Sequence, residues 1–161
     1  LDNDDVSTFK SGFAVAKFTN FKTDGSAGHD ATFPDADFFL MRAAEAYLNF
    51  AEADARLNGG ETTAEGTAAI NAIRKRAKAS TREDKGYSLN DICDEWSREF
   101  YFEGRRRMDL IRFNRYGGNV NYNWQWKGGT HDGQAVDSKY NIYPIPNTEL
   151  TANPNLHNDN Y

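Results

Sequence analysis

The feature that most constrains this chain is the stretch of residues 89–113, where a strongly amphipathic pattern runs into a glycine. Its apolar side chains recur at i, i+3, i+4, i+7 and i+11, the spacing of one helical face: Leu89, Ile92, Cys93, Trp96 and Phe100. Ser88 can cap the first turn through its hydroxyl, and Asp91 lies near the positive end of the helix. Gly104 is a natural end, because glycine reaches left-handed dihedral angles at little cost.

A second short helix is expected over residues 105–113, with Leu110 and Ile111 as its apolar anchors. Four charged residues lie around the joint between the two helices: Glu99, Glu103, Arg106 and Asp109. Their spacing allows charge-assisted hydrogen bonds across the joint. We therefore expect this cluster, together with Gly104, to form a structural signature that holds the two helices at a fixed angle.

The preceding part of the chain predicts a helical hairpin. A helix over about residues 37–57, capped by Asp35 or Asp37, would bury the stripe Leu40, Ala44, Tyr47, Leu48, Ala51 and Ala55. Two glycines, residues 59–60, end this helix, and residues 62–65 read as a capping box for a second helix over about 63–78. That helix would bury Ala69, Ile70, Ile73 and Ala77.

The pair resembles a tetratricopeptide-type hairpin, and residues 88–113 would act as a second, looser pair. The predicted fold is mainly α, with tetratricopeptide-like helical pairs and long irregular loops. At 161 residues we expect a single domain: an irregular lead-in (1–37, with a strand at 12–18), helices (38–113), and loops with a Tyr-Pro-Ile-Pro tail (114–161).

The long irregular region, residues 114–141, holds the best binding candidates. Tyr122, Trp124 and Trp126 alternate, and on a strand all three rings would face one way. Sugar rings stack their C–H faces on aromatic planes, and the alternating polar side chains would bind the hydroxyls: Asn121, Asn123, Gln125 and Lys127. The alternative is that the rings simply cover the helices, and it is favoured because large aromatic side chains are buried more often than not.

The composition argues against several classes of site. A net charge of −5 leaves no basic face large enough for general nucleic-acid binding. The three histidines are isolated, at positions 29, 131 and 157, so we expect no histidine-based metal site. We find no sequence motif for a nucleotide cofactor or a nucleophilic hydrolase, and the acidic loop at 24–30 lacks the EF-hand spacing. The single cysteine, Cys93, reads as a small core residue.

Glu99 and Glu103 could also be read as the carboxylate pair of a glycoside hydrolase, in which one carboxyl group has a raised pKa. The neighbouring arginines would instead lower both pKa values, so a structural salt-bridge joint is the favoured interpretation. The arginine run at 105–107 is read in the same way, as a solvated surface or one paired with Asp94, Glu95 and Glu99.

Five motifs in a fixed order resemble those of the SusD/RagB family of outer-membrane glycan-binding lipoproteins. They are residues 42–53, 71–77, 95–112, 143–149 and 153–156. The third motif reads Glu-Trp-Ser-Arg-Glu-Phe-Tyr-Phe-Glu-Gly, and the fourth reads Tyr-Pro-Ile-Pro-Asn-Thr-Glu. Glu95-Trp96 stands where the family usually has Glu-Arg, and the last five residues also depart from its pattern. The resemblance covers about residues 38–161 and corresponds to the C-terminal portion of such proteins.

The resemblance implies non-catalytic capture of glycans or oligosaccharides at the cell surface, and delivery to a SusC-like TonB-dependent transporter in the outer membrane. It implies no cofactor. Family members carry a lipid anchor, which would be the membrane attachment and which is not seen in this sequence. Two alternatives remain open at this point: a helical protein-interaction scaffold without a sugar site in this portion, and a binder of a non-glycan nutrient.

Overall fold

A computed structural model of the chain describes residues 15, 17–159 and 161. The chain divides into two compact units, Leu1–Glu103 and Gly104–Tyr161, and each is described by itself. Helices are the regular elements of the described residues, where β pairing is limited to isolated bridges such as Phe21 with Ala27. The prediction of a mainly α fold is therefore confirmed, whereas the strand expected at 12–18 lies largely outside the described residues.

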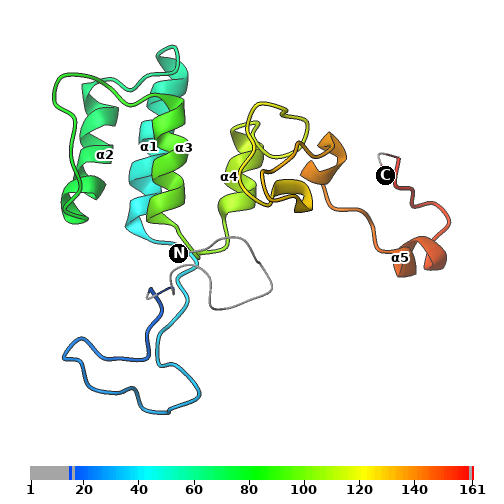
Figure 1. The fold of residues 1–161 in the computed structure, drawn as a ribbon, viewed down its shortest axis with the longest axis horizontal. Helices are drawn as coiled ribbons and strands as arrows, with labels where there is room; N and C mark the ends of the chain where they lie inside the picture. The colour runs from blue at the N-terminus through cyan, green and yellow to red at the C-terminus, as the bar shows by residue number, and fades with distance from the viewer. Residues whose placement is uncertain (1–14, 16, 160) are drawn as a thin grey trace. The chain divides into compact units, whose positions relative to one another are not determined.

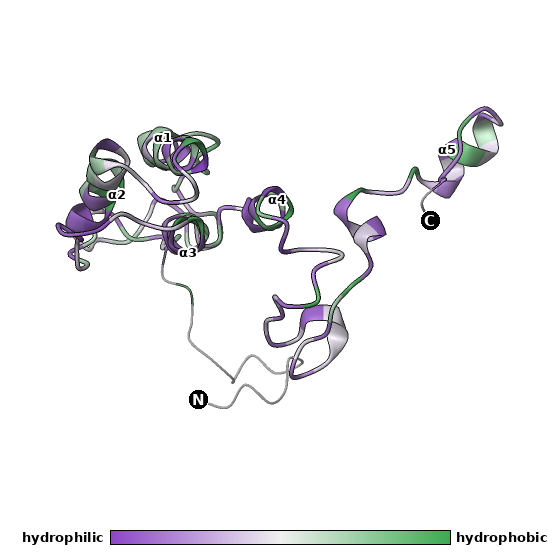
Figure 2. Cartoon of the chain, turned by 90° about the horizontal axis from the view of Figure 1, so that it is seen from above, coloured by the Kyte–Doolittle hydropathy of each residue, from purple (hydrophilic) through white to green (hydrophobic). Residues whose placement is uncertain are grey.

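The first unit is built on three helices, α1 (Ala43–Leu57), α2 (Ala64–Arg76) and α3 (Leu89–Glu99). They lie side by side, with α1 packed against both α2 and α3 (Figures 1 and 2). The fully buried apolar side chains gather between them: Leu48, Ala51, Ala55, Ile70, Ile92, Cys93 and Trp96. The predicted helical hairpin is thus present, and α3 closes its core.

The turn between α1 and α2 uses the two glycines as predicted, because Gly59 and Gly60 have φ angles of 73° and 98°. The predicted capping box is wrong. Asp54 of α1 accepts the backbone N–H of Thr63 at 2.7 Å, and so satisfies the start of α2 from the neighbouring helix. Thr62 instead bonds the hydroxyl of Thr67 at 2.8 Å.

Helix α1 begins at Ala43 and not at residue 37. Residues 38–41 lie outside any helix, with Leu40 87% exposed, and Asp35 accepts the backbone N–H of His29 instead of capping a helix. Ala44, Leu48, Ala51 and Ala55 form the buried stripe as predicted, but Leu40 and Tyr47 do not belong to it. On α2, Ile70 and Ile73 are buried as predicted and Ala77 is exposed.

The start of α3 matches its prediction. The Ser88 hydroxyl accepts the backbone N–H of Asp91 at 3.2 Å, and the Asp91 carboxylate accepts the N–H of Ser88 at 2.9 Å. The helix ends at Glu99, five residues before Gly104. The Glu99 carbonyl accepts from Arg42 at 2.6 Å and from Lys17 at 3.1 Å. These cations therefore replace the backbone N–H groups that a further helical turn would offer to this carbonyl. Gly104 does have a positive φ, 76°.

In the second unit, helix α4 (Arg106–Arg112) buries Leu110 as predicted, whereas the other predicted anchor, Ile111, stays partly exposed. Three short elements follow: η1 (Lys127–Gly129), η2 (Ser138–Asn141) and α5 (Asn147–Ala152). Residues 122–126 do not form a strand on which the three rings would face one way, because Trp126 adopts a left-handed φ of 67° that turns the chain into η1. No helix among the described residues is long and apolar enough to cross a membrane.

Candidate functional site

The structure places the predicted aromatic row in the second unit, but as a folded cluster and not as an even row. The Tyr122 and Trp124 rings pack edge to face at 6.2 Å between centroids. Tyr116, which the sequence analysis missed, stacks on Trp124 at 6.3 Å. Trp126 pairs instead with His131, at 5.4 Å. The left-handed turn at Trp126 therefore separates its ring from the other two predicted rings.

Lys127 contacts this cluster and is only 3% exposed. Its ammonium donates to the carbonyl of Tyr122 at 2.7 Å and lies 4.9 Å from the centre of the Trp124 ring. Burial lowers the pKa of Lys127, because a charged amine loses hydration inside a protein. The prediction that Lys127 faces a sugar hydroxyl is wrong: it holds the backbone and the ring from inside.

Two arginines, Arg106 of α4 and Arg115, also contact the Tyr122 ring or its hydroxyl. Arg106 donates to the Tyr122 hydroxyl at 3.1 Å, and the Arg115 guanidinium lies 4.6 Å from the centre of the same ring. Trp124 keeps 37% of its surface exposed, so it is the predicted ring that presents most area to solvent. We call Tyr116, Tyr122, Trp124 and Lys127 the aromatic cluster.

A second group of rings lies in the tail of the same unit. The Arg107 guanidinium stacks 4.0 Å from the centre of Tyr143 and donates to the carbonyl of Tyr140 at 2.7 Å. Tyr140 packs edge to face on Tyr161, whose hydroxyl donates to the carbonyl of Ile142 at 2.6 Å. The sequence predicted only an extended Tyr-Pro-Ile-Pro segment here, because the ring contacts depend on the fold and not on spacing.

Glu99 is the last residue of α3 and Glu103 follows it in the first unit, and both bind Arg42. Its Nε and Nη2 atoms donate to the Glu103 carboxylate, each at 2.8 Å, and its Nη1 donates to Glu99. Arg76 also pairs with Glu99, and Lys17 with Glu103. Burial alone would raise both glutamate pKa values, but the hydrogen bonds from these cations outweigh it and hold both below their usual range.

The other members of the expected joint, Arg106 and Asp109, lie on α4 in the second unit. Asp109 is fully buried and pairs with Arg112 at 2.9 Å and Arg105 at 3.5 Å. The sequence also assigned Glu95 to the arginine run at 105–107. Glu95 instead accepts from Arg74 at 2.6 Å and Arg98 at 2.7 Å, so its charge is satisfied within the first unit.

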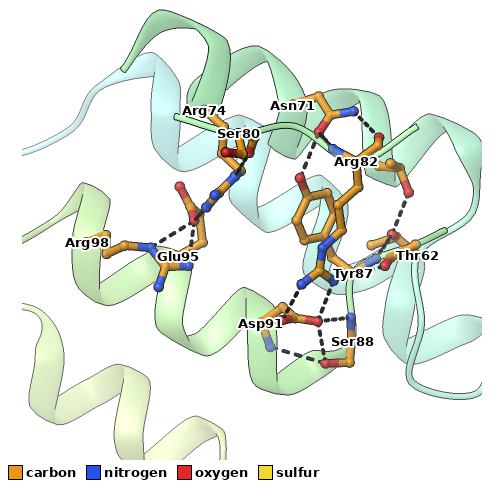
Figure 3. Close-up of polar contacts among 12 residues, drawn as sticks. Thr62, Asn71, Arg74, Ser80, Arg82, Tyr87, Ser88, Asp91, Glu95 and Arg98 are labelled. Atoms are coloured by element: carbon orange, nitrogen blue, oxygen red, sulfur yellow. Dashed lines mark hydrogen bonds and ion pairs between the residues drawn. The ribbon is translucent and has the colours of Figure 1, made fainter. Parts of the chain in front are cut away.

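A third polar network ties the segment after α2 to the start of α3 (Figure 3). Arg82 makes two bonds to the Asp91 carboxylate, at 2.8 and 2.9 Å, and its guanidinium lies 4.5 Å from the centre of the Tyr87 ring. Asn71 donates to the Arg82 carbonyl at 2.7 Å and accepts from the Tyr87 hydroxyl at 2.8 Å. These bonds tie the segment at residues 82–88 to α2 and α3, and so stabilise the first unit.

No group of three or more histidine, cysteine or acidic side chains in the described part of the chain could hold a metal ion. Asp24 and Asp30, in the acidic loop, accept from neighbouring residues: Asp24 from Ser26 at 2.7 and 2.9 Å, and Asp30 from the backbone N–H groups of Thr32 and Phe33. Their carboxylates therefore hold turns together.

Comparison with known proteins decides the family. A sequence profile of the SusD family matches residues 1–161. The chain belongs to the SusD family. It is 44% identical over 156 residues to the starch-binding protein SusD of Bacteroides thetaiotaomicron, an alignment that covers 97% of this chain and 27% of that relative. The resemblance drawn from the five motifs is therefore confirmed.

Solved structures agree with the SusD-family fold. A SusD superfamily protein from Parabacteroides distasonis superposes with a TM-score of 0.60 over 77% of this chain and 27% of its own, at 24% identity. A structure named BT4246 gives a TM-score of 0.57 over 83% of this chain and 25% of its own, at 26% identity. The chain thus spans about a quarter of the length of the relatives that it matches.

Proposed function

We propose that the chain is part of a protein that captures glycans at the cell surface without cleaving them. The observation that carries this proposal is the 44% identity, along nearly all of the chain, to a protein named for starch binding. Starch is a polymer of sugar rings with apolar C–H faces and polar hydroxyl rims. A binder of such a polymer needs exposed aromatic surface beside hydrogen-bonding side chains.

The sugar-contacting residues that we propose are Tyr122, Trp124 and Trp126, with Trp124 at the centre. Three things support this choice. Trp124 presents the most solvent-accessible surface of the three, its ring is held by Tyr116 and Tyr122, and exposed amide side chains flank it at positions 121, 123 and 125. A ring that is already held in place loses little conformational freedom when a sugar stacks on it.

The absence of catalysis is part of the proposal, and the acidic pair of the first unit supports it. A glycoside hydrolase needs a carboxylic acid that stays protonated near neutral pH, with a raised pKa. Glu99 and Glu103 have lowered pKa values and share one guanidinium. They are suited to a permanent ionic joint, and in our proposal they serve with Gly104, Arg106 and Asp109 as a structural signature.

We further propose delivery of the captured glycan to a SusC-like TonB-dependent transporter, at the surface of the outer membrane. The membrane attachment would be a lipid anchor on the full-length protein. This part of the proposal rests on family membership alone. It predicts that the full-length protein co-purifies with a transporter of that class after gentle detergent extraction of outer membranes.

Native affinity electrophoresis on a panel of soluble polysaccharides, starch first, tests the glycan site. We expect one glycan to retard the chain, Trp124→Ala to lose at least most of the retardation, and Val120→Ala to keep it. Val120 is the matched control, because it is exposed and lies in the same loop. Both variants must show the thermal stability of the unchanged chain.

Equal retardation of Trp124→Ala and the unchanged chain would contradict the assignment of the site to this cluster. Retardation by no glycan, with the chain folded, would favour the two other readings of this portion of the protein. One is a helical scaffold for protein partners and the other is a binder of a non-glycan nutrient. Release of shorter sugars from any polysaccharide would contradict the non-catalytic proposal.

A further inference from the structure

Arg107 of α4 joins the two groups of rings in the second unit. Its guanidinium lies 4.0 Å from the centre of the Tyr143 ring and 5.2 Å from the centre of the Tyr116 ring. Tyr116 in turn stacks on Trp124, so rings and a cation follow one another from the aromatic cluster to the tail of the unit. Tyr143 is 77% exposed, which leaves the far end of this series open to solvent.

Backbone contacts hold the two groups of rings beside each other. The Asn141 side chain accepts the N–H of Gly117 at 2.8 Å and donates to the Gly117 carbonyl at 3.3 Å. A Cβ atom at Gly117 would lie 2.5 Å from the carbonyl oxygen of Asp137, so a larger residue would force these segments apart. Tyr116 and Tyr140 are the sequence neighbours of the two bonded residues. The rings are therefore placed before a ligand binds, which lowers the entropy cost of binding.

Arg107 and Lys139 bring positive charge to these rings. Two other arginines of the same segment pair with the buried carboxylate of Asp109. Within the described part of the chain, Arg107 and Lys139 have no carboxylate partner: Arg107 donates from Nη2 to the Tyr140 carbonyl, and Lys139 lies 5.4 Å from the centre of the Tyr140 ring. Their charges therefore stand beside exposed rings and not beside acidic groups.

The charge of the second unit has the same sign. Residues 104–161 contain seven lysine and arginine residues against five aspartate and glutamate residues, although the whole chain has a net charge of −5. A local excess of cations attracts an anionic ligand to this unit. Such a ligand must also offer faces that stack on tyrosine and tryptophan rings.

A sugar that carries a carboxylate meets both requirements. Its C–H face stacks on an aromatic ring, and its planar carboxylate accepts paired N–H groups from the edge of a guanidinium. A guanidinium stacked on a ring, as Arg107 is on Tyr143, keeps that edge available. A neutral sugar would leave the cations of this surface without an ionic partner.

We propose that Arg107, supported by Tyr143 and Lys139, forms a subsite for the carboxylate of an acidic sugar. The subsite lies beside the aromatic cluster, where neighbouring sugar rings of the same glycan stack. The ligand class of the second unit is then a glycan that contains uronic acid residues. This inference rests on the glycan function proposed above and adds the chemical class of the glycan.

Isothermal titration calorimetry of the full-length protein with two matched ligands tests the subsite. One ligand is maltoheptaose, a soluble fragment of starch, and the other is its C6-oxidised form, in which carboxylates replace the CH2OH groups. Titrations are made at about 0.15 M salt, where attraction between exposed charges is screened beyond about 8 Å. The variants are Arg107→Gln and the control Lys75→Gln, which removes the same charge from an exposed position of α2.

We expect the oxidised form to bind about tenfold more tightly than the neutral form, because it adds a charge-assisted pair of hydrogen bonds. Arg107→Gln should lose most of this preference and change the Kd of the neutral form by no more than about twofold, whereas Lys75→Gln should keep the preference. Tyr143→Ala removes the ring that holds the guanidinium, and it serves as the second variant if Arg107→Gln does not fold.

Equal affinity for the two ligands, or a preference that Arg107→Gln keeps, would overturn the subsite. If Trp124→Ala still weakens binding of the neutral form in that case, the proposed glycan site stands and only the acidic class is wrong. Binding of neither ligand would also overturn the subsite, and electrophoresis on the polysaccharide panel would then decide the glycan function by itself.

Discussion

At the scale of single residues, two buried charges organise the two units in different ways. Lys127 is buried among backbone carbonyls and a tryptophan ring, and Glu99 is buried among guanidinium groups. A buried charge is tolerated only when hydrogen bonds or opposite charges replace its lost hydration. Each of these residues therefore fixes the groups around it, and each should be sensitive to substitution.

Replacing Lys127 with methionine keeps the length of the side chain but removes the donor to the Tyr122 carbonyl. A buried acceptor left unsatisfied costs about 1–3 kcal/mol, so the loop at 115–134 should open more often. In hydrogen exchange, the amide of Gln134, which donates to the Lys127 carbonyl, should exchange about tenfold or more faster. Lys139→Met is the control and should change exchange there by no more than about twofold. Equal effects of the two variants would contradict this role.

Glu99 makes the free energy of unfolding of the first unit depend on pH. Its pKa is lowered in the folded chain, since the bonds from Arg76 and Arg42 outweigh burial, so it stabilises the fold above its unfolded value of 4.5. This stabilisation is lost as the pH falls through the lower, folded pKa. Urea unfolding followed by helical circular dichroism should therefore show a steeper loss of stability below about pH 4.5 in the unchanged chain than in Glu99→Gln. Glu83→Gln, an exposed control, should keep the steep loss.

At the scale of the elements, local signals in the sequence were enough wherever the partners lie close along the chain. The Ser88 and Asp91 cap, the glycine turn at 59–60 and the buried face of α3 from Ile92 to Phe100 were predicted correctly, whereas Leu89 is partly exposed. Local sequence signals failed where a group further away along the chain formed the hydrogen bond instead. Asp54 satisfies the start of α2, although it lies nine residues before Thr63.

The same limit explains the errors in the candidate site. Alternation of Tyr122, Trp124 and Trp126 predicts a strand only if the backbone stays extended, and the left-handed turn at Trp126 breaks it. The burial of Lys127 depends on a cage of carbonyls from Tyr122 and Arg115, which no residue spacing reports. The sequence shows which aromatic and cationic side chains the candidate site contains, but not how they are arranged relative to one another.

The cap of α3 gives a prediction for a whole element. The Asp91 carboxylate accepts from Ser88 and from Arg82, so Asp91→Ala removes the carboxylate half of the capping box and the tether of the preceding segment together. We expect a loss of about 1–2 kcal/mol in the free energy of unfolding, measured in urea. Asp94→Ala removes the same charge from an exposed position of α3 and should cost less than about 0.5 kcal/mol. A loss of the same size in both variants would show that net charge, and not the cap, is responsible.

At the scale of the whole molecule, buried apolar side chains are distributed unevenly between the two units. The core residues of α1, α2 and α3 belong to the first unit, whereas Leu110 is the buried apolar anchor described in the second. Short elements and ring contacts with cations make up most of the second unit. Because burial of apolar surface is the main source of folding free energy, the first unit should carry most of the stability. That the chain forms a single domain stays a prediction. The expected difference in stability between the two units makes it testable.

The test is a chain that ends at Glu103. Trp96 is its only tryptophan, is fully buried, and donates from its indole N–H to Glu52 at 2.8 Å, so its emission reports directly on the core. We expect blue-shifted Trp96 emission, helical circular dichroism and one cooperative urea transition, because the described core needs no residue beyond 103. A chain of residues 104–161 should show no cooperative transition, since one buried anchor cannot offset the entropy of ordering its loops. Red-shifted Trp96 emission in the shortened chain would mean that the core forms only with the second unit present, and the chain would then be a single domain.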